Sequence, residues 1–343
     1  MHPIKFYIFI LIVLFFSSGA VAQKLHSPKE VEQYMKKSLI NYQIDSVDII
    51  FESVSFPIIE TGQFLVSNEE EIQIQQKKFH LSRKAKKARK KARKAAQKNN
   101  FPKAQKLYEK AIKKAPDHSE LIQEFADFYW GNNKIEEMIL LEEKEIEANP
   151  IDFIAYAKLA SAYQSLGNKE KALEYIITAH LYNRNNIKIT QKLIDIFREN
   201  KMHYQNHTFY PEYKIENTDG KILIQAKDAP WRSYAGCKAL WQNEETYREE
   251  MKHLANVNID KIEQKECLLN ALISYNKMKT GKENFPLLEI LGASLKKGSV
   301  DDFILYEIEL RQNPNLIHFL SKEKIDRIIH YLKTTRLTVN EEL

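Results

Sequence analysis

The fold is decided by residues 154–184, which read IAYAKLASAYQSLGNKEKALEYIITAHLYNR. Apolar and small side chains recur in this stretch at three- and four-residue spacings, as on one face of a helix. The same pattern occurs earlier in the chain, where Ala126 matches Ala160 and Tyr129 matches Tyr163, so its period is about 34 residues. A period of about 20 to 50 residues is typical of a solenoid, whose units bury their apolar faces on each other. We therefore predict a mostly α chain with a solenoid of helix pairs at its centre.

About three and a half copies of the pattern span residues 85–202. Pro116 and Pro150 end two successive copies and are separated by the same period. The first copy begins with an unusual helix. One face of it carries Ala85, Ala88, Ala92 and Ala95, and the other faces carry Lys or Arg. The fourth copy begins near Leu193, and no second helix follows it. The rest of the chain is therefore organised differently.

The array resembles the tetratricopeptide repeat. The best copy carries Tyr156, Leu159, Ala160 and Tyr163 on its first helix, Gly167 at the turn, and Ala172, Ile176 and Ala179 on its second. Arg184 stands where that family usually has a closing proline. The resemblance implies an α-solenoid whose first helices line a concave groove that binds peptides. It covers roughly a third of the chain, and it says more about fold than about function.

By this resemblance, the groove exposes polar residues of mixed sign and one large aromatic side chain. The mixed signs differ from the Lys/Arg clamp that recognises a carboxylate terminus. Trp130 is the natural anchor for a partner. The alternative is a groove filled by the protein's own N-terminal arm or C-terminal helices. The predicted partner-binding residues are Gln123, Asp127, Trp130, Lys158, Ser161, Gln164, Gln191, Lys192, Asp195 and Arg198.

The N-terminus has the layout of a secretory signal peptide. A short basic start precedes the apolar run from Phe6 to Phe16, and small residues end at Ala22. A membrane anchor would need about 20 apolar residues to span the bilayer. We therefore expect residues 1–22 to be removed after Ala22, and the mature chain to be periplasmic or secreted. No later segment is apolar enough to suggest a membrane span.

Three further segments complete the organisation. Residues 23–84 are predicted to hold a helix that begins at a capping box, Ser27 to Glu30, and then an extended or irregular arm. Residues 203–242 contain a predicted β-hairpin around Asp219-Gly220 and an aromatic segment whose helical spacing favours a core role for Trp231. Residues 243–343 are predicted to be helical, with a loose tail from Thr334. Together with the leader, these segments resemble exported bacterial repeat proteins of unassigned function.

Charge is unevenly distributed along the chain. Lys and Arg number 52 and Asp and Glu number 46, yet residues 72–108 carry fourteen Lys or Arg and no acidic residue. This stretch suggests contact with an anionic envelope polymer or lipid surface, or else a solvated helix face. Specific nucleic-acid binding is disfavoured, because the densest part has no aromatic side chain for base stacking. The predicted anion-binding residues are Arg83, Lys84, Lys87, Arg89, Lys90, Lys91, Arg93 and Lys94.

Spacings that carry chemistry are scarce. The two cysteines, Cys237 and Cys267, suggest either a disulfide or two small buried side chains on neighbouring helices. His203 and His207 are four residues apart without a clear third ligand, so no metal site is predicted. No phosphate loop or catalytic motif is present, and no cofactor is predicted.

Three hypotheses of function follow. The first is a non-catalytic scaffold or peptide-binding module outside the cytoplasm. The second is an anchoring module whose basic helix binds an anionic polymer or lipid surface. The third is an enzyme with its site in the C-terminal region, for which loss of activity on replacing Trp231 would be the test.

Overall fold

The structure is a computed structural model. It describes residues 25–47, 55–67, 72–76, 80–204, 206–253, 259–278, 285–336 and 338–339. The predicted signal peptide, residues 1–22, lies outside the described residues. The chain forms two compact units: the sheet unit, residues 1–53 and 210–292, and the repeat unit, residues 54–209 and 293–343. Each unit thus combines segments that are far apart in the sequence, and each unit is described by itself.

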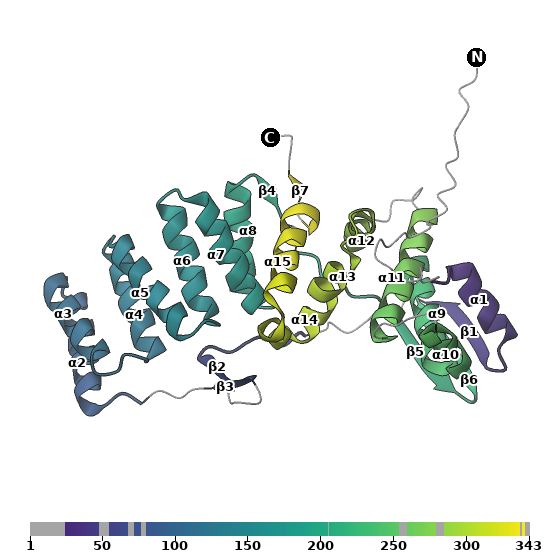
Figure 1. The fold of residues 1–343 in the computed structure, drawn as a ribbon, viewed down its shortest axis with the longest axis horizontal. Helices are drawn as coiled ribbons and strands as arrows, with labels where there is room; N and C mark the ends of the chain where they lie inside the picture. The colour runs from purple at the N-terminus through teal and green to yellow at the C-terminus, as the bar shows by residue number, and fades with distance from the viewer. Residues whose placement is uncertain are drawn as a thin grey trace, which may run out of the picture. The chain divides into compact units, whose positions relative to one another are not determined.

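The repeat unit contains the predicted helix pairs, which stand side by side in one row (Figure 1). These helices are α2 (Arg83–Gln97), α3 (Phe101–Ile112), α4 (Ser119–Gly131), α5 (Ile135–Ala148), α6 (Phe153–Ser165), α7 (Lys169–Tyr182) and α8 (Ile187–Glu199). The repeat period also appears in the backbone. Equivalent residues of four successive copies, Asn99, Asn133, Gly167 and Lys201, all have positive φ angles of 55° to 72°. The predicted solenoid is therefore confirmed over three helix pairs and the first helix of a fourth copy.

Small residues allow α6 and α7 to pack closely. Ala160 of α6 is fully buried, and Ala172 and Ala179 of α7 are 1% and 0% exposed. Each helix is also capped at its start: Asp152 accepts hydrogen bonds from backbone amides of α6, and Asn168 accepts one from α7. These caps satisfy amide groups that have no partner within the helix.

Replacing Ala160 with Leu should destabilise the repeat unit by about 1–3 kcal/mol, because three extra carbon atoms have no space at this helix crossing. Thermal unfolding monitored by circular dichroism would measure the change. Ser165→Leu, at an exposed position on the same helix, is the matched control and should change the melting temperature little. Equal melting temperatures for the Ala160→Leu variant and the unmodified chain would contradict the helix-pair packing.

The C-terminal part of the repeat unit is more ordered than the sequence suggested. It comprises α13 (Val300–Phe303), a π-helical turn (Ile304–Glu309), α14 (Leu310–Gln312), a 3-10 turn (Pro314–Phe319), α15 (Lys322–Tyr331), a second π-helical turn (Leu332–Arg336) and β7 (Thr338–Val339). The strand β7 pairs antiparallel with β4 (Met202–His203). The prediction of a loose tail from Thr334 is therefore wrong for residues 334–336 and 338–339. Arg336 is held because its guanidinium donates to the buried carboxylate of Glu307, with 2.7 Å between Nε and Oε1.

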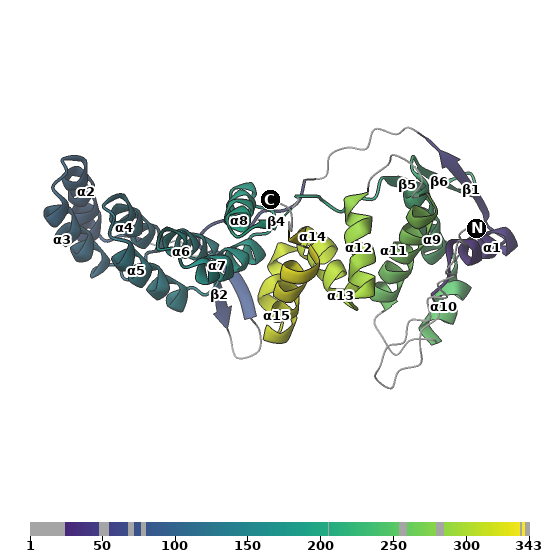
Figure 2. The same ribbon diagram turned by 90° about the horizontal axis from the view of Figure 1, so that it is seen from above.

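The sheet unit is built around three strands in the order β1-β6-β5. The predicted hairpin is confirmed as β5 (Tyr213–Thr218) and β6 (Lys221–Ala226). Its partner β1 (Asn41–Ser46) runs parallel to β6, with Tyr42 opposite Ile222. The helices are α1 (Pro28–Lys37), α9 (Ala229–Asn243), α10 (Glu245–His253), α11 (Ile259–Met278) and α12 (Pro286–Lys296), whose last turn crosses into the repeat unit. Figure 2 shows α9 and α11 beside the strands. The predicted capping box is present at Ser27 and Glu30.

Glu266 on α11 places a carboxylate in the core of the sheet unit, where it is 0% exposed. It accepts hydrogen bonds from Trp241 Nε1 at 2.6 Å, from Tyr247 Oη at 2.8 Å and from the backbone amide of His26 at 2.6 Å. The Trp231 side chain is 7% exposed and Trp241 is 2% exposed. The core role predicted for this aromatic segment is confirmed, since both rings lie inside the unit.

Both cysteines lie next to this carboxylate. Cys237 on α9 and Cys267 on α11 are fully buried and unbonded, and 2.8 Å separates their Sγ atoms. Among the described residues, no helix combines the length and the apolar character that crossing a bilayer requires.

Candidate binding surfaces on the repeat array

The first helices of three successive copies position the predicted groove residues. On each helix these residues recur at three- and four-residue spacings, so they share one face. The helix α4 supplies Gln123, Asp127 and Trp130, α6 supplies Lys158, Ser161 and Gln164, and α8 supplies Gln191, Lys192, Asp195 and Arg198. We call this surface the groove face.

Lys158 connects α4 to α6. Its ammonium donates to the backbone carbonyl of Gln123 at 2.8 Å and lies 2.6 Å from Asp127 Oδ1. It also lies 3.5 Å from Oε1 of Glu142, which is on α5. The side chain of Lys158 is 18% exposed. Because three oxygen atoms already surround it, Lys158 is poorly suited to bind a carboxylate of a partner.

The remaining groove residues form a second group on α6 and α8. Gln164 Nε2 donates to Glu199 at 2.5 Å, which connects the two helices. Within α8, Asp195 accepts from Gln191 at 3.1 Å and from Arg198 at 3.4 Å. Ser161 instead donates to its own helix at Ala157, and burial lowers the pKa of Lys192. The structure thus connects Gln123, Asp127 and Lys158 in one polar cluster and Gln191, Asp195 and Arg198 in a second. These contacts do not test whether a partner binds there.

Trp130 is the large aromatic side chain of the groove face, and 41% of its surface is exposed. It occupies the last turn of α4, one turn beyond Asp127. An exposed indole beside an exposed carboxylate offers an apolar surface together with a hydrogen-bond acceptor. Trp130 is therefore an accessible aromatic anchor among the predicted residues.

A buried acidic cluster lies behind the groove face, and sequence reasoning missed its character. Glu142 and Glu145 on α5 are 0% and 2% exposed. Gln123 donates to Glu142 at 3.3 Å and to Asp152 at 3.4 Å. Burial raises the pKa of Glu142 to about 8 and that of Glu145 to about 7.

Glu142 should make the stability of the repeat unit depend on pH. Between pH 4.5, the ordinary pKa, and about 8, the folded protein keeps a proton that the unfolded chain releases. Stability therefore falls as the pH rises through this window, by an amount on the order of a few kcal/mol. Melting temperatures from pH 5 to 9 should fall less steeply for Glu142→Gln than for the unmodified chain. Glu147→Gln, exposed on the same helix, should keep the original slope. An unchanged slope in the Glu142→Gln variant would contradict the raised pKa.

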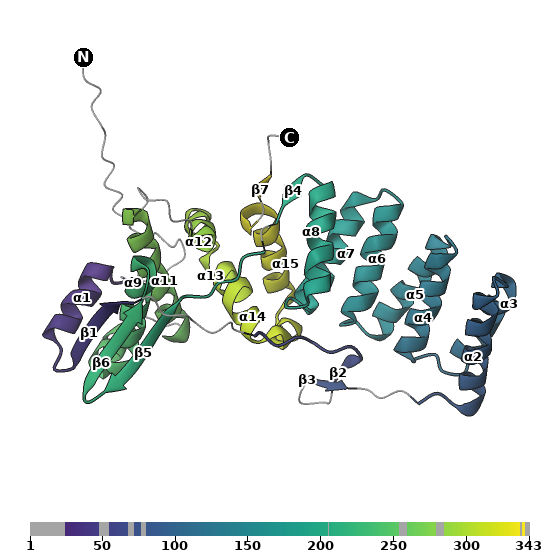
Figure 3. The same ribbon diagram turned by 180° about the vertical axis from the view of Figure 1, so that it is seen from behind.

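The N-terminal arm, residues 55–67, binds the edge of the array through asparagine side chains. Asn183 donates to the carbonyl of Ile59 at 2.9 Å and accepts from its amide at 3.2 Å. Asn149, at the equivalent position of the preceding copy, donates to the carbonyl of Gln63 at 3.1 Å. Both asparagines follow the last residue of a second helix, so the arm lies along helix ends (Figure 3).

The arm continues into β2 (Gln63–Ser67), which pairs antiparallel with β3 (Ile72–Gln76). The prediction of an extended or irregular arm missed this hairpin. Within the described part of the chain, no groove-face residue has a hydrogen bond or ion pair to the arm. The hydrogen bonds that hold the arm go to the helix ends at Asn149 and Asn183.

The basic helix α2 divides the predicted anion-binding residues into two sets. Arg89 and Arg93 point toward α4, where their Nε atoms lie 2.7 Å from the carboxylate oxygens of Glu124. Tyr108 also donates to Glu124 at 2.9 Å. Residues 77–79 of the basic stretch 72–108 lie outside the described residues. The other predicted anion-binding residues are exposed: Arg83, Lys84, Lys87, Lys90, Lys91 and Lys94.

Histidine and cysteine positions bring no metal-binding cluster together in the described ranges, where no three metal-type ligands converge. His203 is placed in β4, and His207 follows it in an irregular segment.

Comparisons with known proteins reveal limited likeness. No family model matches the sequence, and no curated protein matches it. Among solved structures, the first tetratricopeptide-repeat domain of Spaghetti (RPAP3) with an HSP90 peptide is 20% identical, with a TM-score of 0.31; the match covers 36% of this chain and 98% of that one. A MamA protein is 12% identical, with a TM-score of 0.31, and the match covers 59% of this chain and 97% of that one.

A tetratricopeptide-repeat protein from Parabacteroides merdae is likewise 12% identical, with a TM-score of 0.32, and the match covers 74% of this chain and 100% of that one. The helix pairs of this chain are of tetratricopeptide type, as their repeat register and buried small residues indicate.

Proposed function

We propose that this tetratricopeptide-type chain is a non-catalytic scaffold that binds a protein or peptide through its groove face, outside the cytoplasm. The observation that carries the proposal is Trp130, which is 41% exposed at the end of a polar face formed by three first helices. Large aromatic side chains that stay accessible are frequent energetic anchors of protein interfaces.

The charges of the groove face indicate which kind of partner it suits. Lys158 is balanced by Asp127 at 2.6 Å, and Arg198 is paired with Asp195 at 3.4 Å. A partner that relied on its terminal carboxylate would have to compete with these acids. A segment with an apolar side chain for Trp130 and hydrogen-bonding groups for Gln164 and Gln191 suits the face better.

No role in catalysis is assigned. The Trp231 ring, whose replacement would test an enzyme in the C-terminal region, packs edge-on against Phe285 with 5.8 Å between ring centroids. Its 7% exposure favours a structural contribution. A loss of activity on its replacement would therefore have to be separated from loss of folding.

The experiment is crosslinking in living cells from a photoreactive residue at position 130, with position 140 as control. Leu140 is 69% exposed on a second helix, away from the groove face. One protein recovered from position 130 and not from 140 is expected. Its purified form should bind the Trp130→Ala variant at least tenfold more weakly, about 1.4 kcal/mol, and the Leu140→Ala variant with unchanged affinity. Capture of only the chain's own segments at position 130 would refute a partner-binding groove.

Location is tested separately, through the N-terminus of the protein recovered from cells. Removal of residues 1–22 predicts that it begins at Gln23. Mass spectrometry of the periplasmic or secreted fraction would measure this. A chain that retains Met1 in the cytoplasmic fraction would contradict export and leave the groove proposal intact.

A further inference from the structure

The helix α2 has surfaces of opposite character. Its buried face consists of Ala85, Ala88, Ala92 and Ala95, which are at most 6% exposed and pack against α3. Lysines at four-residue spacing lie on the side opposite these alanines. The exposed cations of this helix and its C-cap, apart from the arginines that face α4, are together called the cationic face: Arg83, Lys84, Lys86, Lys87, Lys90, Lys91, Lys94 and Lys98.

This face is separate from the arginines that hold α2 in place. Arg89 and Arg93 lie on the flank toward α4, where Glu124 neutralises them. In the part of the chain that the structure describes, none of the cationic-face residues has a hydrogen bond or an ion pair between its side chain and another side chain. The ion pairs therefore orient α2 and leave the cationic face toward solvent.

The concentration of charge opposes helix formation. Helix α2 contains no acidic residue, and its first turn is cationic, where the helix dipole favours anions. Its fifteen residues extend over roughly 22 Å. Neighbouring cations on it lie closer together than the Debye length, about 8 Å at physiological salt, so their repulsion is only partly screened. Bound anions would relieve this repulsion.

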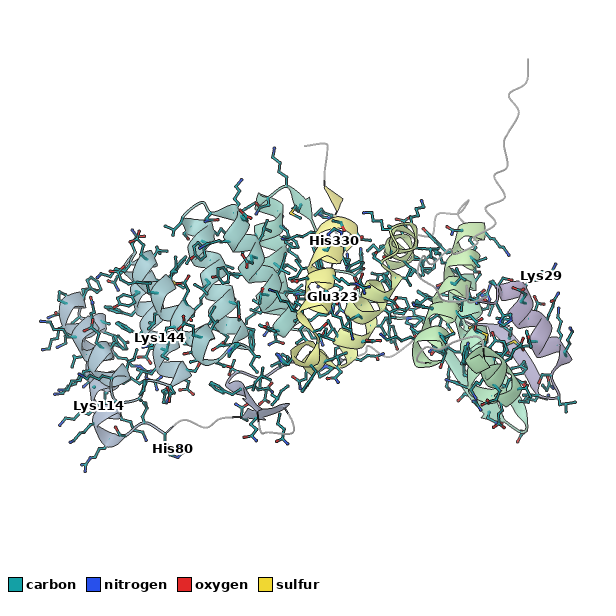
Figure 4. All side chains as sticks on the ribbon, in the orientation of Figure 1. Lys29, His80, Lys114, Lys144, Glu323 and His330 are labelled. Atoms are coloured by element: carbon teal, nitrogen blue, oxygen red, sulfur yellow. The ribbon has the colours of Figure 1, made fainter. Side chains whose placement is uncertain are left out.

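Exposed lysines of α3 extend the same charge. Lys103, Lys106, Lys110 and Lys113 are exposed along that helix, and Lys114 follows its end. Figure 4 labels Lys114 at this end of the repeat array, with side chains of α2 and α3 extending outward from the ribbon. These lysines add to the positive charge at this end of the repeat array, where α3 also carries Glu109.

The type of side chain indicates the chemistry of the partner. All but one of the cationic-face residues are lysines, which act as point charges and lack the bidentate geometry of arginine. The face has no apolar or aromatic side chain that could enter a bilayer or stack on a base. A row of point charges along one helix matches a flexible chain of anions more closely than it matches a lipid surface.

We propose that the cationic face binds a flexible linear polyanion, by charge and without reading its sequence. This surface is independent of the groove face. Its binding would release counterions from the polymer, so that affinity must fall steeply with salt.

The experiment measures binding of the mature chain to fluorescently labelled long-chain polyphosphate between 50 and 200 mM NaCl. A variant with Lys86, Lys87, Lys90 and Lys94 replaced by Gln should bind at least tenfold more weakly. Its slope of log affinity against log salt should be smaller by about 3, since each lost phosphate contact removes about 0.7. Because these side chains are exposed, the melting temperature should not fall.

The matched control replaces four exposed lysines elsewhere in the repeat unit, Lys169, Lys188, Lys201 and Lys324, by Gln. It removes the same total charge and should keep both affinity and slope. An equal loss in both variants would overturn the proposal, because net charge alone would then account for binding. Binding to phosphatidylserine vesicles without binding to polyphosphate would also overturn it, in favour of a lipid surface.

Discussion

Replacement of Glu307 by Gln is expected to destabilise the repeat unit by about 3–5 kcal/mol, which is typical for removing one partner of a buried ion pair. The carboxylate of Glu307 is fully buried between two guanidinium groups. Arg184 Nη2 lies 2.8 Å from Oε2, and Arg336 Nε lies 2.7 Å from Oε1. Glutamine has nearly the same shape, so the loss would come from charge and not from a cavity.

Several aromatic groups complete the surroundings of this ion cluster. Tyr331 donates to Glu307 at 3.2 Å, and the guanidinium carbon of Arg184 lies 3.3 Å from the ring centroid of Tyr306. Burial alone would raise the pKa of Glu307, yet the charges of Arg336 and Arg184 hold it below its ordinary value. Glu307 is therefore ionised at neutral pH, and both arginines would lose their counter-charge in the variant.

Urea unfolding monitored by circular dichroism would measure the loss, and hydrogen exchange would locate it. Exchange should accelerate most in α7 and in residues 332–336, which the cluster connects. Glu323→Gln on α15 is the control, because Glu323 is exposed (Figure 4). If Glu307→Gln costs no more than Glu323→Gln, the buried ion cluster does not stabilise the C-terminal part of the repeat unit.

The helix pairs were predictable because their determinants are local. Ala126 and Ala160 lie at equivalent points of two successive copies, and both are fully buried. The turn residues at 99, 133 and 167 share a positive φ angle for the same reason, since each lies in the turn that joins the two helices of one pair. Residues that repeat in the sequence thus make equivalent contacts in each copy of the helix pair.

The sheet unit was only partly predictable, because part of its pairing is long-range. The Asp219-Gly220 hairpin was predicted, whereas the strand β1, which reads NYQIDS, was not. In β1 only Tyr42 and Ile44 alternate with polar residues, and its partner β6 follows the entire helix array in sequence. Similarly, Arg336 gave no sign of burial until Glu307 and Arg184 supplied its environment. Such elements form because of their partners and not because of their own propensity.

The helices that carry the predicted groove residues were predictable, and the contacts of those residues were not. Lys158 lies on a first helix, as the spacing predicts, yet the nearby acids Asp127 and Glu142 decide what Lys158 is able to bind. The role of the asparagines that bind the arm was also not predictable from the sequence, because a C-capping Asn is common at helix ends. Their role appears only when the backbone of Ile59 is placed beside Asn183.

Oxidation of Cys237 and Cys267 to a disulfide is expected to stabilise the sheet unit by about 3–4 kcal/mol, because the bond closes a loop in the unfolded chain. The residues are 30 positions apart, and 2.8 Å separates their Sγ atoms on α9 and α11. Urea unfolding of the oxidised and reduced forms would measure the difference. The Cys237→Ala, Cys267→Ala double variant is the control and should unfold identically under both conditions.

The rate at which the bond forms should depend on folding. Both thiols are fully buried, and burial raises the pKa of each. Exchange with oxidised glutathione begins with a thiolate that attacks one glutathione sulfur and releases a glutathione thiol. The second cysteine then displaces the other glutathione. Because the folded, reduced protein offers neither access nor thiolate, we expect it to resist oxidation, whereas the refolding chain should oxidise readily.

Because of this difference, the oxidation state of the cysteine pair should indicate the compartment in which the chain folded. A chain exported before folding meets an oxidising environment while Cys237 and Cys267 are accessible, and should be recovered with no free thiol. A chain folded in a reducing cytoplasm buries both thiols first and should retain them. Alkylation under denaturing conditions, followed by mass spectrometry, would count the free thiols in protein taken from cells. Two free thiols in protein recovered from an oxidising compartment would contradict the disulfide and leave the pair as two small core side chains.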